Sequence, residues 1–279
     1  MTRPTPRPDE FTTADDAIAR HREELKKRFP LPSPSKKPRR PGPATLGASI
    51  AVLGLAGGLF WLDPAYKTEQ FSSAAGQRQL IELADGSRMT LDSSSRVAVS
   101  WHLRTRQVEL QAGQALFDVA PARYRPFHTL AGATRIIVVG TRYNVSRVQE
   151  DVRVTVEQGK VSVLGRDAGL MLLPGDQVLV HDGQLGRRSQ VDASAVAAWA
   201  EGRLVFDRTP LREVLDVIRR YRQISIRLDD DSLAQLPVSG TFDSARLDRM
   251  LALLPKILPV NVAADADGGL LVTRKAPRK

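Results

Sequence analysis

The feature that most constrains this chain is Ala44–Leu62, an apolar stretch without a charged residue. A helix needs about 20 mainly apolar residues to cross the hydrocarbon core of a bilayer. An isolated segment in lipid can satisfy its own backbone only as a helix. Asp63 lies just after the stretch. Four cations lie just before it: Lys36, Lys37, Arg39 and Arg40. Because positive charge stays on the cytoplasmic side, the sequence predicts one transmembrane helix at 44–62, with the N-terminus inside and residues 63–279 outside.

Two other readings of this stretch compete with a membrane span. A cleaved signal peptide normally has its apolar core much nearer the N-terminus, and no small-x-small cleavage site follows Leu62 at once. A buried core helix is also apolar on all sides. The basic, proline-rich run before the stretch and the Asp63-Pro64 stop after it favour the span over both alternatives.

Composition places most of the chain in a soluble fold on one side of that span. Of the 279 residues 26% are charged and 5% aromatic, unlike a protein with many spans. There is no cysteine, and the 4 histidines are not paired at metal-ligand spacing, so we expect no metal and no cofactor. The net charge of +10 is concentrated at the N-terminal arm and at Arg274–Lys279, a distribution that favours lipid headgroups over nucleic acid.

The N-terminal arm, residues 1–43, contains one candidate helix. Thr13 is a cap residue and acids follow it, so a helix is expected over 14–28. Ile18, Leu25 and Phe29 lie on one narrow face of it. An isolated helix this short is marginal in water, so it either folds against a partner or remains a solvated tail. Residues 31–43 are rich in proline and form a stiff basic tether.

Residues 68–190 read as consecutive short strands separated by glycines, without a helix of useful length. Asp85-Gly86 between alternating runs is the strongest hairpin signal. This pattern indicates a mainly β domain, a sandwich or a β-roll. The strands are expected at 79–83, 88–91, 96–101, 106–111, 115–119, 127–131, 134–139, 143–147, 152–158, 160–164, 170–173 and 177–181.

Several side chains of this region invite a functional reading but favour a structural one. Aromatic residues at 117, 127 and 143 are expected in the core. Gly140-Thr141 is expected to bend the chain between strands. No spacing pairs the carboxylates for acid–base chemistry, so we expect turn and edge roles for Asp85, Asp118 and Glu157.

Residues 196–276 follow a different pattern, in which strands alternate with amphipathic helices. A strand at 203–207 precedes a helix at 211–221, which Thr209 caps and Pro210 starts, and a second strand follows. The order repeats with a strand at 238–242, a helix at 245–258 that Pro255 is expected to end early, and further strands. Two βαβ units in tandem predict a small α/β domain with helices packed on a short sheet.

The order and spacing of these blocks resembles the FecR family of membrane-spanning regulators. The blocks include Leu83–Ser87, Gly113–Val119, Val139–Val145 and Leu173–Gln177, with Gln114 and Tyr143 as mild departures. Trp199–Asp207 resembles the C-terminal part of the same regulators, which is similar to the short domain at the N-termini of secretins and TonB-dependent receptors. The motif residues are Asp85, Gly86, Gly113, Phe117, Pro126, Phe127, Gly140, Thr141, Asn144, Gly159, Trp199 and Gly202.

The resemblance implies a regulator of iron transport rather than an enzyme. It implies an inner-membrane protein that relays a signal from an outer-membrane TonB-dependent receptor to an extracytoplasmic-function sigma factor, as inhibitor or activator. The sigma factor would contact the arm through Ile18, Leu25, Phe29 and Leu31. The arm has no tryptophan, unlike many family members, which leaves open a membrane-anchored periplasmic binding module without a transcriptional role. A hydrolase using Asp118, His128 or Glu157 is a third class, for which no nucleophile motif stands out.

Overall fold

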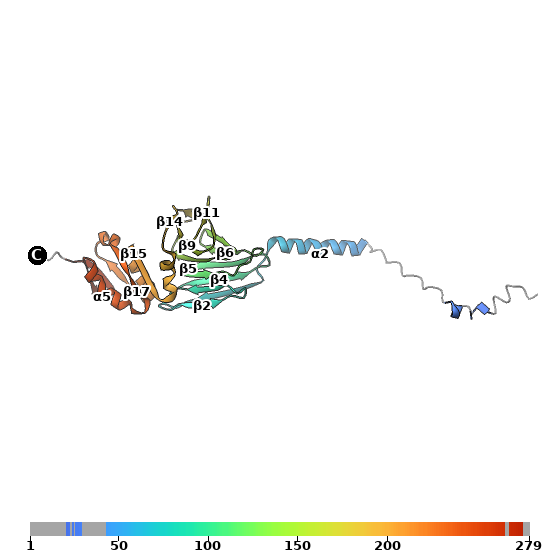
Figure 1. Ribbon diagram of the computed structural model, residues 1–279, viewed down its shortest axis with the longest axis horizontal. Helices are drawn as coiled ribbons and strands as arrows, with labels where there is room; N and C mark the ends of the chain where they lie inside the picture. The colour runs from blue at the N-terminus through green and yellow to red at the C-terminus, as the bar shows by residue number, and fades with distance from the viewer. Residues whose placement is uncertain (1–20, 23, 25, 30–42, 266–267, 276–279) are drawn as a thin grey trace, which may run out of the picture. The chain divides into compact units, whose positions relative to one another are not determined.

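The computed structural model describes residues 21, 22, 24, 26–29, 43–265 and 268–275. The chain divides into two compact units, Met1–Ala56 and Gly57–Lys279. Figure 1 shows the chain coloured by residue number. Helix α2, Pro43–Leu62, forms where the apolar stretch predicts a helix, and its side chains are described from Val52 onward. Within the described residues, we find no helix that combines the length and the apolar character needed to cross a membrane.

The first domain of the larger unit is built from fourteen strands that form one extended sheet. Its central path runs β11-β10-β7-β6-β5-β8-β9-β12-β13. Neighbouring strands are antiparallel, except that β5 and β6 are parallel. The strands are β1 (Lys67–Ser72), β2 (Gln79–Glu82), β3 (Arg88–Leu91), β4 (Arg96–Trp101), β5 (Arg106–Asp118), β6 (Phe127–Ala131), β7 (Thr134–Val138), β8 (Arg142–Val148), β9 (Asp151–Gln158), β10 (Val161–Leu164), β11 (Gly169–Leu172), β12 (Asp176–His181), β13 (Gln184–Leu185) and β14 (Ser189–Gln190). The mainly β character predicted from the sequence is confirmed.

Strand β5 explains how one sheet encloses a core. Its first half pairs with β4 and β6, and its second half pairs with β3 and β8. Two strands, 106–111 and 115–119, were expected here, and that expectation is wrong because Gly113 bends the chain without ending the strand. Gly113 has φ +92°, and a Cβ atom there would lie 2.3 Å from Ser95 Oγ. Glycine therefore permits both the bend and the close approach of Ser95.

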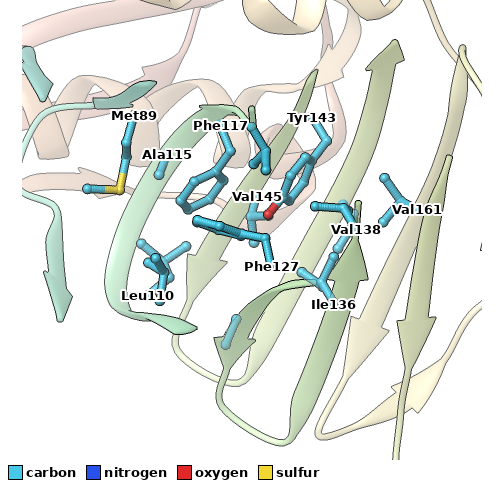
Figure 2. Close-up of a cluster of buried hydrophobic side chains, with 14 of the residues drawn as sticks. Met89, Leu110, Ala115, Phe117, Phe127, Ile136, Val138, Tyr143, Val145 and Val161 are labelled. Atoms are coloured by element: carbon cyan, nitrogen blue, oxygen red, sulfur yellow. The ribbon is translucent and has the colours of Figure 1, made fainter. Parts of the chain in front are cut away.

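Both halves of the sheet contribute to a single apolar core. Phe117, Phe127 and Tyr143 are buried in it, as the sequence predicts. Figure 2 shows the rings of Phe117 and Tyr143 side by side, with centroids 5.2 Å apart and planes inclined by 22°. The Tyr143 hydroxyl hydrogen-bonds the Thr129 hydroxyl at 2.6 Å, which satisfies its polar end inside the core.

Two predicted turns in this domain are confirmed by the backbone. Gly86 has φ +82° in the turn between β2 and β3, where its N–H donates to Leu83 O at 3.0 Å. At Gly140 a Cβ atom would meet Pro121 Cα at 2.8 Å, and the register between β8 and β9 shifts next to it, between Arg142 and Tyr143. The expected bend at Gly140-Thr141 thus lies where two chain segments pass very close to each other.

The second domain, orange to red in Figure 1, contains two small sheets and two longer helices. One sheet pairs β15 with β17, and the other has the order β16-β19-β18. The elements are α3 (Ala193–Ala197), η1 (Ala198–Glu201), β15 (Arg203–Pro210), α4 (Leu211–Arg222), β16 (Ile226–Leu228), η2 (Asp231–Gln235), β17 (Pro237–Asp243), η3 (Ser244–Arg246), α5 (Leu247–Ile257), β18 (Val260–Ala264) and β19 (Leu270–Arg274). The apolar faces of α4 and α5 supply many of the side chains in the core of this domain.

Three local expectations for this domain are wrong. The two strands of each expected βαβ unit lie in different sheets. Strand β15 of the first unit pairs with β17 of the second, while β16 pairs with β19, so the pairing is between units rather than within them. Thr209 does not cap α4, since it belongs to β15 and the Leu211 N–H donates to Leu236 O at 2.8 Å instead. Pro255 lies inside α5, which continues to Ile257 because the buried Leu251 and Leu254 hold its last turns against the core.

Candidate interaction surfaces

The two domains of the larger unit meet at Trp199, which is 5% exposed. Its indole N–H donates to Asn144 Oδ1 at 3.0 Å, and the same oxygen accepts from Gln114 Nε2 at 3.0 Å. The Trp199 carbonyl accepts from Arg78 at 2.9 Å. Two motif residues far apart in sequence, Asn144 on β8 and Trp199 on η1, thus form one buried contact between the domains.

A second contact between the domains is made by the loop that joins β3 to β4. The hydroxyl of Tyr221 on α4 donates to the Asp92 carboxylate, which is 2% exposed. Ser93 Oγ and Ser94 Oγ donate to the carbonyl of Arg220 at 2.8 and 3.2 Å. Burial raises the pKa of Asp92, and the hydrogen bonds from Tyr221 and Ser93 offset only part of that shift. The end of α4 is therefore held against the β domain by a buried polar cluster.

Between the same two domains lies a cleft of about 780 Å³, called here the β15 cleft. One wall is strand β15, from Arg203 to Asp207, and another is the outer face of β8, β9 and β12. Helix α4 contributes Glu213, which forms an ion pair with Arg153 of β9 at 3.1 Å.

The end of α2 that belongs to the larger unit is tied to the turn between β4 and β5. The Asp63 carboxylate accepts from the Arg104 N–H at 2.9 Å and from the Thr105 hydroxyl at 3.0 Å. Its carbonyl hydrogen-bonds His102 Nδ1 at 2.5 Å. Slight burial alone would raise the pKa of Asp63. The hydrogen bonds from Arg104 and Thr105 outweigh this effect, so the pKa of Asp63 is lowered. The Arg104 guanidinium also lies 5.0 Å from the centroid of the Phe60 ring.

The family motif around Asp85 encloses a buried arginine that the sequence analysis did not single out. Arg106 is 2% exposed and donates to Asp85 Oδ2 at 2.6 Å and to the carbonyls of Ala120 and Arg125 at 3.0 and 2.9 Å. Its backbone N–H donates to Pro126 O at 3.0 Å. Burial alone would raise the pKa of Asp85, but the hydrogen bonds from Ser87 and Arg106 lower it. The motif is thus a structural ion pair that joins the start of β5 to the turn between β2 and β3 and to the connection between β5 and β6.

The other motif glycines mark tight backbone positions. Gly159 has φ +91° and faces Thr141, whose hydroxyl donates to Lys160 O at 3.0 Å. Gly202 has φ +91°, and a Cβ atom there would lie 3.0 Å from the Arg78 guanidinium. Both positions favour glycine because an L side chain would be strained there.

The residues considered for hydrolysis are not arranged as a catalytic site. Asp118 and Glu157 both contact Arg142, at 3.7 and 2.7 Å. Burial lowers the pKa of His128, and the positive charge of Arg135 adds to that effect. Within the described part of the chain, no group of three or more His, Cys, Asp or Glu side chains could hold a metal ion.

The expected sigma-factor contact falls mainly outside the described residues. Ile18, Leu25 and Leu31 lie outside them. Phe29 is described and is 71% exposed. Residues 21, 22, 24 and 26–28 are helical, and His21 Nδ1 lies 3.4 Å from Glu24 Oε2. The proposed face of the arm therefore stays a prediction.

Sequence reasoning missed Arg106, Asp92 and Tyr221 as the residues that hold loops and domains together. All three sit in ordinary contexts along the chain, and their partners lie 21 residues away for Arg106 and 129 residues away for Asp92 and Tyr221. The sequence holds one signal that could have identified Arg106. It is a charged residue at a position of β5 that the alternating pattern assigns to the core.

Comparison with known proteins agrees with the motif pattern. The family model described as FecR protein matches residues 69–162, and the model described as FecR, C-terminal matches residues 203–268. Two crystal structures of a candidate anti-sigma factor from Parabacteroides distasonis ATCC 8503, at 2.50 and 1.65 Å resolution, cover 75% of this chain and 100% of their own. They align with a TM-score of 0.68, at 24% and 25% sequence identity. A comparison with curated proteins gives no match.

Both domain models match in the expected order, and together they span more than half of the chain. The first runs from β1 into β10 and includes the Asp85–Arg106 pair, and the second covers the strands and helices from β15 to the turn before β19. The chain is therefore a member of the FecR family.

Proposed function

We propose that this chain is a single-pass inner-membrane regulator of an extracytoplasmic-function sigma factor. Its N-terminal arm lies in the cytoplasm, α2 crosses the membrane and both folded domains lie in the periplasm. The signal comes from a TonB-dependent outer-membrane receptor through the C-terminal domain. The observation that carries the proposal is the ordered match of both FecR domain models after an apolar helix. The likeness to a candidate anti-sigma factor supports the same class of function.

The contacts within the larger unit support a relay from the C-terminal domain toward α2. A partner that binds the C-terminal domain acts on the β domain through Trp199 and Tyr221. The β domain in turn holds the end of α2 through Asp63. Each of these contacts is a small set of hydrogen bonds.

The membrane topology is tested with reporter fusions at both ends of the chain. Alkaline phosphatase folds and is active only outside the cytoplasm, so a fusion after Lys279 should be active and a fusion before Met1 should be silent. A control chain with Leu53, Leu55 and Leu59 each changed to Lys should lose the activity of the C-terminal fusion. Silence of the C-terminal fusion in the unchanged chain would contradict the topology.

The sigma-factor contact is tested by co-purification of the full chain with its cognate sigma factor. Changing Ile18, Leu25 and Phe29 together to Ala removes the apolar face and should abolish co-purification. A matched control changes Arg20, Glu23 and Lys27 to Ala, which lie on the opposite side of a helix with 3.6 residues per turn. Equal loss in both variants, or none in the first, would rule out this face.

The alternative function, an anchored periplasmic binding module, is distinguished by deleting residues 1–35. Under the proposed function, the deletion changes transcription from a promoter of the sigma factor. A rise would identify an inhibitor, and a fall would identify an activator. Transcription that is unchanged with and without the receptor's signal would favour the alternative.

A further inference from the structure

Two turns of the β domain lie beside the end of α2. The Asp63 carboxylate accepts hydrogen bonds from the turn at residues 102–105, between β4 and β5, at 2.9 and 3.0 Å. The turn at residues 122–125, between β5 and β6, contacts the first turn, because the Arg125 guanidinium donates to His102 O at 2.5 Å. Both turns therefore lie next to the point where the helix joins the β domain.

These turns and the end of α2 present apolar and aromatic side chains to solvent. Tyr124, in the second turn, is 99% exposed, and Leu103, in the first, is exposed as well. Trp61 and Tyr66, on either side of Asp63 in the sequence, are also exposed. The Tyr66 hydroxyl accepts from the Arg125 guanidinium at 3.2 Å, which places Tyr66 beside the second turn. Residues 61–66, 102–105 and 122–125 are called here the α2-end surface.

The α2-end surface is also positively charged. It contains three arginines and one acidic residue, namely Arg104, Arg123, Arg125 and Asp63. The Arg104 guanidinium donates to Phe60 O at 3.3 Å, and that of Arg125 donates to the carbonyl and hydroxyl groups already named. Within the described part of the chain, none of the three guanidinium groups forms an ion pair with a carboxylate. Their charge is therefore not neutralised by the protein itself.

The composition of this surface is that of a membrane interface. Tyr and Trp rings settle at the level of the lipid headgroups, and arginines are attracted to the phosphates of anionic lipids. A bilayer crossed by α2 would begin at Leu62, directly before Asp63, which ties the first turn to the helix. The lipid headgroups are therefore the partner that the helix itself brings to this surface.

We propose that the α2-end surface docks on the outer leaflet of the membrane that α2 crosses. Leu103 and Tyr124 lie at the level of the headgroups, and Arg104, Arg123 and Arg125 contact the phosphates of anionic lipids. The β domain is then held against the bilayer by its own loops as well as by the helix. The inference rests on the proposed function, because docking requires α2 to be in the bilayer.

The test measures how close single labels on the full chain lie to the bilayer. Since the chain has no cysteine, one introduced cysteine carries one label. The chain with a fluorescent nitrobenzoxadiazole label at Tyr124→Cys is placed, one chain per disc, in nanodiscs of phosphatidylcholine with about 30% phosphatidylglycerol. Lipids that carry a nitroxide at the headgroup should quench at least about half of its emission. Discs of phosphatidylcholine alone should quench it less.

A label at Asp167→Cys is the control for position. Phe127, just after the second turn, pairs with Val138 at the end of β7, whereas Leu164, just before the exposed loop that holds Asp167, pairs with Arg135 near the start of β7. The loop of Asp167 therefore lies at the opposite end of these strands. A label there should keep its emission in the same discs.

A label at Leu55→Cys, within α2, reports separately on the membrane span. Lipids that carry the nitroxide on the acyl chain should quench this label if α2 is in the bilayer. The result distinguishes a failure of docking from a failure of the proposed function.

A pair of matched variants tests which residues dock. In the chain labelled at Tyr124→Cys, the variant Leu103→Ser/Arg123→Glu should weaken docking by about tenfold and bring the emission near that of the Asp167→Cys label. The control Leu80→Ser/Arg187→Glu makes the same changes at two exposed positions outside the surface. It should leave the quenching unchanged.

Four results would overturn the proposal. If the label at Leu55→Cys is quenched and those at Tyr124→Cys and Asp167→Cys are equally bright, α2 crosses the bilayer without docking of the surface. An unquenched label at Leu55→Cys would remove the membrane span and the docking together. Equal quenching in the two double variants, or with and without phosphatidylglycerol, would exclude these residues or anionic lipid. Quenching that appears only with two chains in one disc would assign the surface to a second copy.

Discussion

The β domain and the C-terminal domain reach stability by different means. In the β domain, one long bent strand joins two halves of a sheet around one core, and a buried ion pair holds two loops together. The C-terminal domain divides its strands between two small sheets, and its core cluster includes Leu116 from the β domain. The β domain thus has a core of its own, whereas the core of the C-terminal domain includes a side chain of its neighbour.

The largest effect expected is on the β domain. Arg106→Met leaves the Asp85 carboxylate, 10% exposed, without its cation, and should lower the free energy of unfolding by about 3–5 kcal/mol. Urea unfolding followed by the fluorescence of Trp101 and Trp199 measures the loss. The double variant Asp85→Asn/Arg106→Met should lose less than Arg106→Met alone. If the single variant loses less than the double one, the pair is not what locks the loops.

The bend in β5 supplies a second test of the β domain. Gly113→Ala forces a methyl group against Ser95, with Cα and Oγ inside contact distance at 2.6 and 2.3 Å, and should cost about 3 kcal/mol. Gly86→Ala is the control, since Gly86 also has positive φ but no atom within 4 Å of the added Cβ, and it should cost about 1 kcal/mol. Equal melting temperatures of the two variants would show that the close approach does not matter.

The dependence of the C-terminal domain on its neighbour is tested at the contact between them. Trp199→Phe removes the hydrogen bond to Asn144 and a little buried volume, and should cost about 1–2 kcal/mol. The loss should appear in hydrogen exchange of α4 and β15, while amides of β8 and β9 keep their protection. Equal loss of protection in β8 would mean that the two domains unfold as one. It would contradict the view that the β domain is stable without its neighbour.

The smallest effect is a change of stability with pH at Asp92. Because folding raises the pKa of Asp92, its contribution is most favourable below its unfolded pKa, about 3.9, and is lost as the pH rises through the folded value. Asp92→Asn should therefore gain in melting temperature relative to the unchanged chain between about pH 4 and pH 7.

The pKa of Asp230 shifts in the opposite direction to that of Asp92, so Asp230 serves as the control. Hydrogen bonds from Ser232 and Arg274 lower its pKa, so its contribution is present above the unfolded pKa and is lost as the pH falls. Asp230→Asn should lose stability relative to the unchanged chain as the pH rises. The same sign for both variants would contradict the assignment of Asp92.

Sequence patterns predicted most elements of both domains because their periodicity is local. The alternation along β3, β4 and β8 and the apolar faces of α4 and α5 follow from the order of residues alone. The strand pairings that split the C-terminal sheets were not predictable in this way, nor was the continuation of β5 through Gly113. Both depend on neighbours distant in the sequence, such as Ser95 beside Gly113.

The candidate surfaces could likewise be predicted only where their residues follow a local motif. The motif residues Asn144 and Trp199 were identified by resemblance, but their mutual hydrogen bond joins positions 55 residues apart. The β15 cleft could not be predicted, since it exists only where two domains meet.

Strand β5 has a mechanical consequence for the whole β domain. Because each half of the strand is hydrogen-bonded to different partners on both sides, β5 is a backbone segment that both halves of the sheet share. Strand β1 pairs with β4 alone, so a pull applied through the chain end at β1 should open that edge pair first. The load would reach the shared strand β5 only afterwards, through β4.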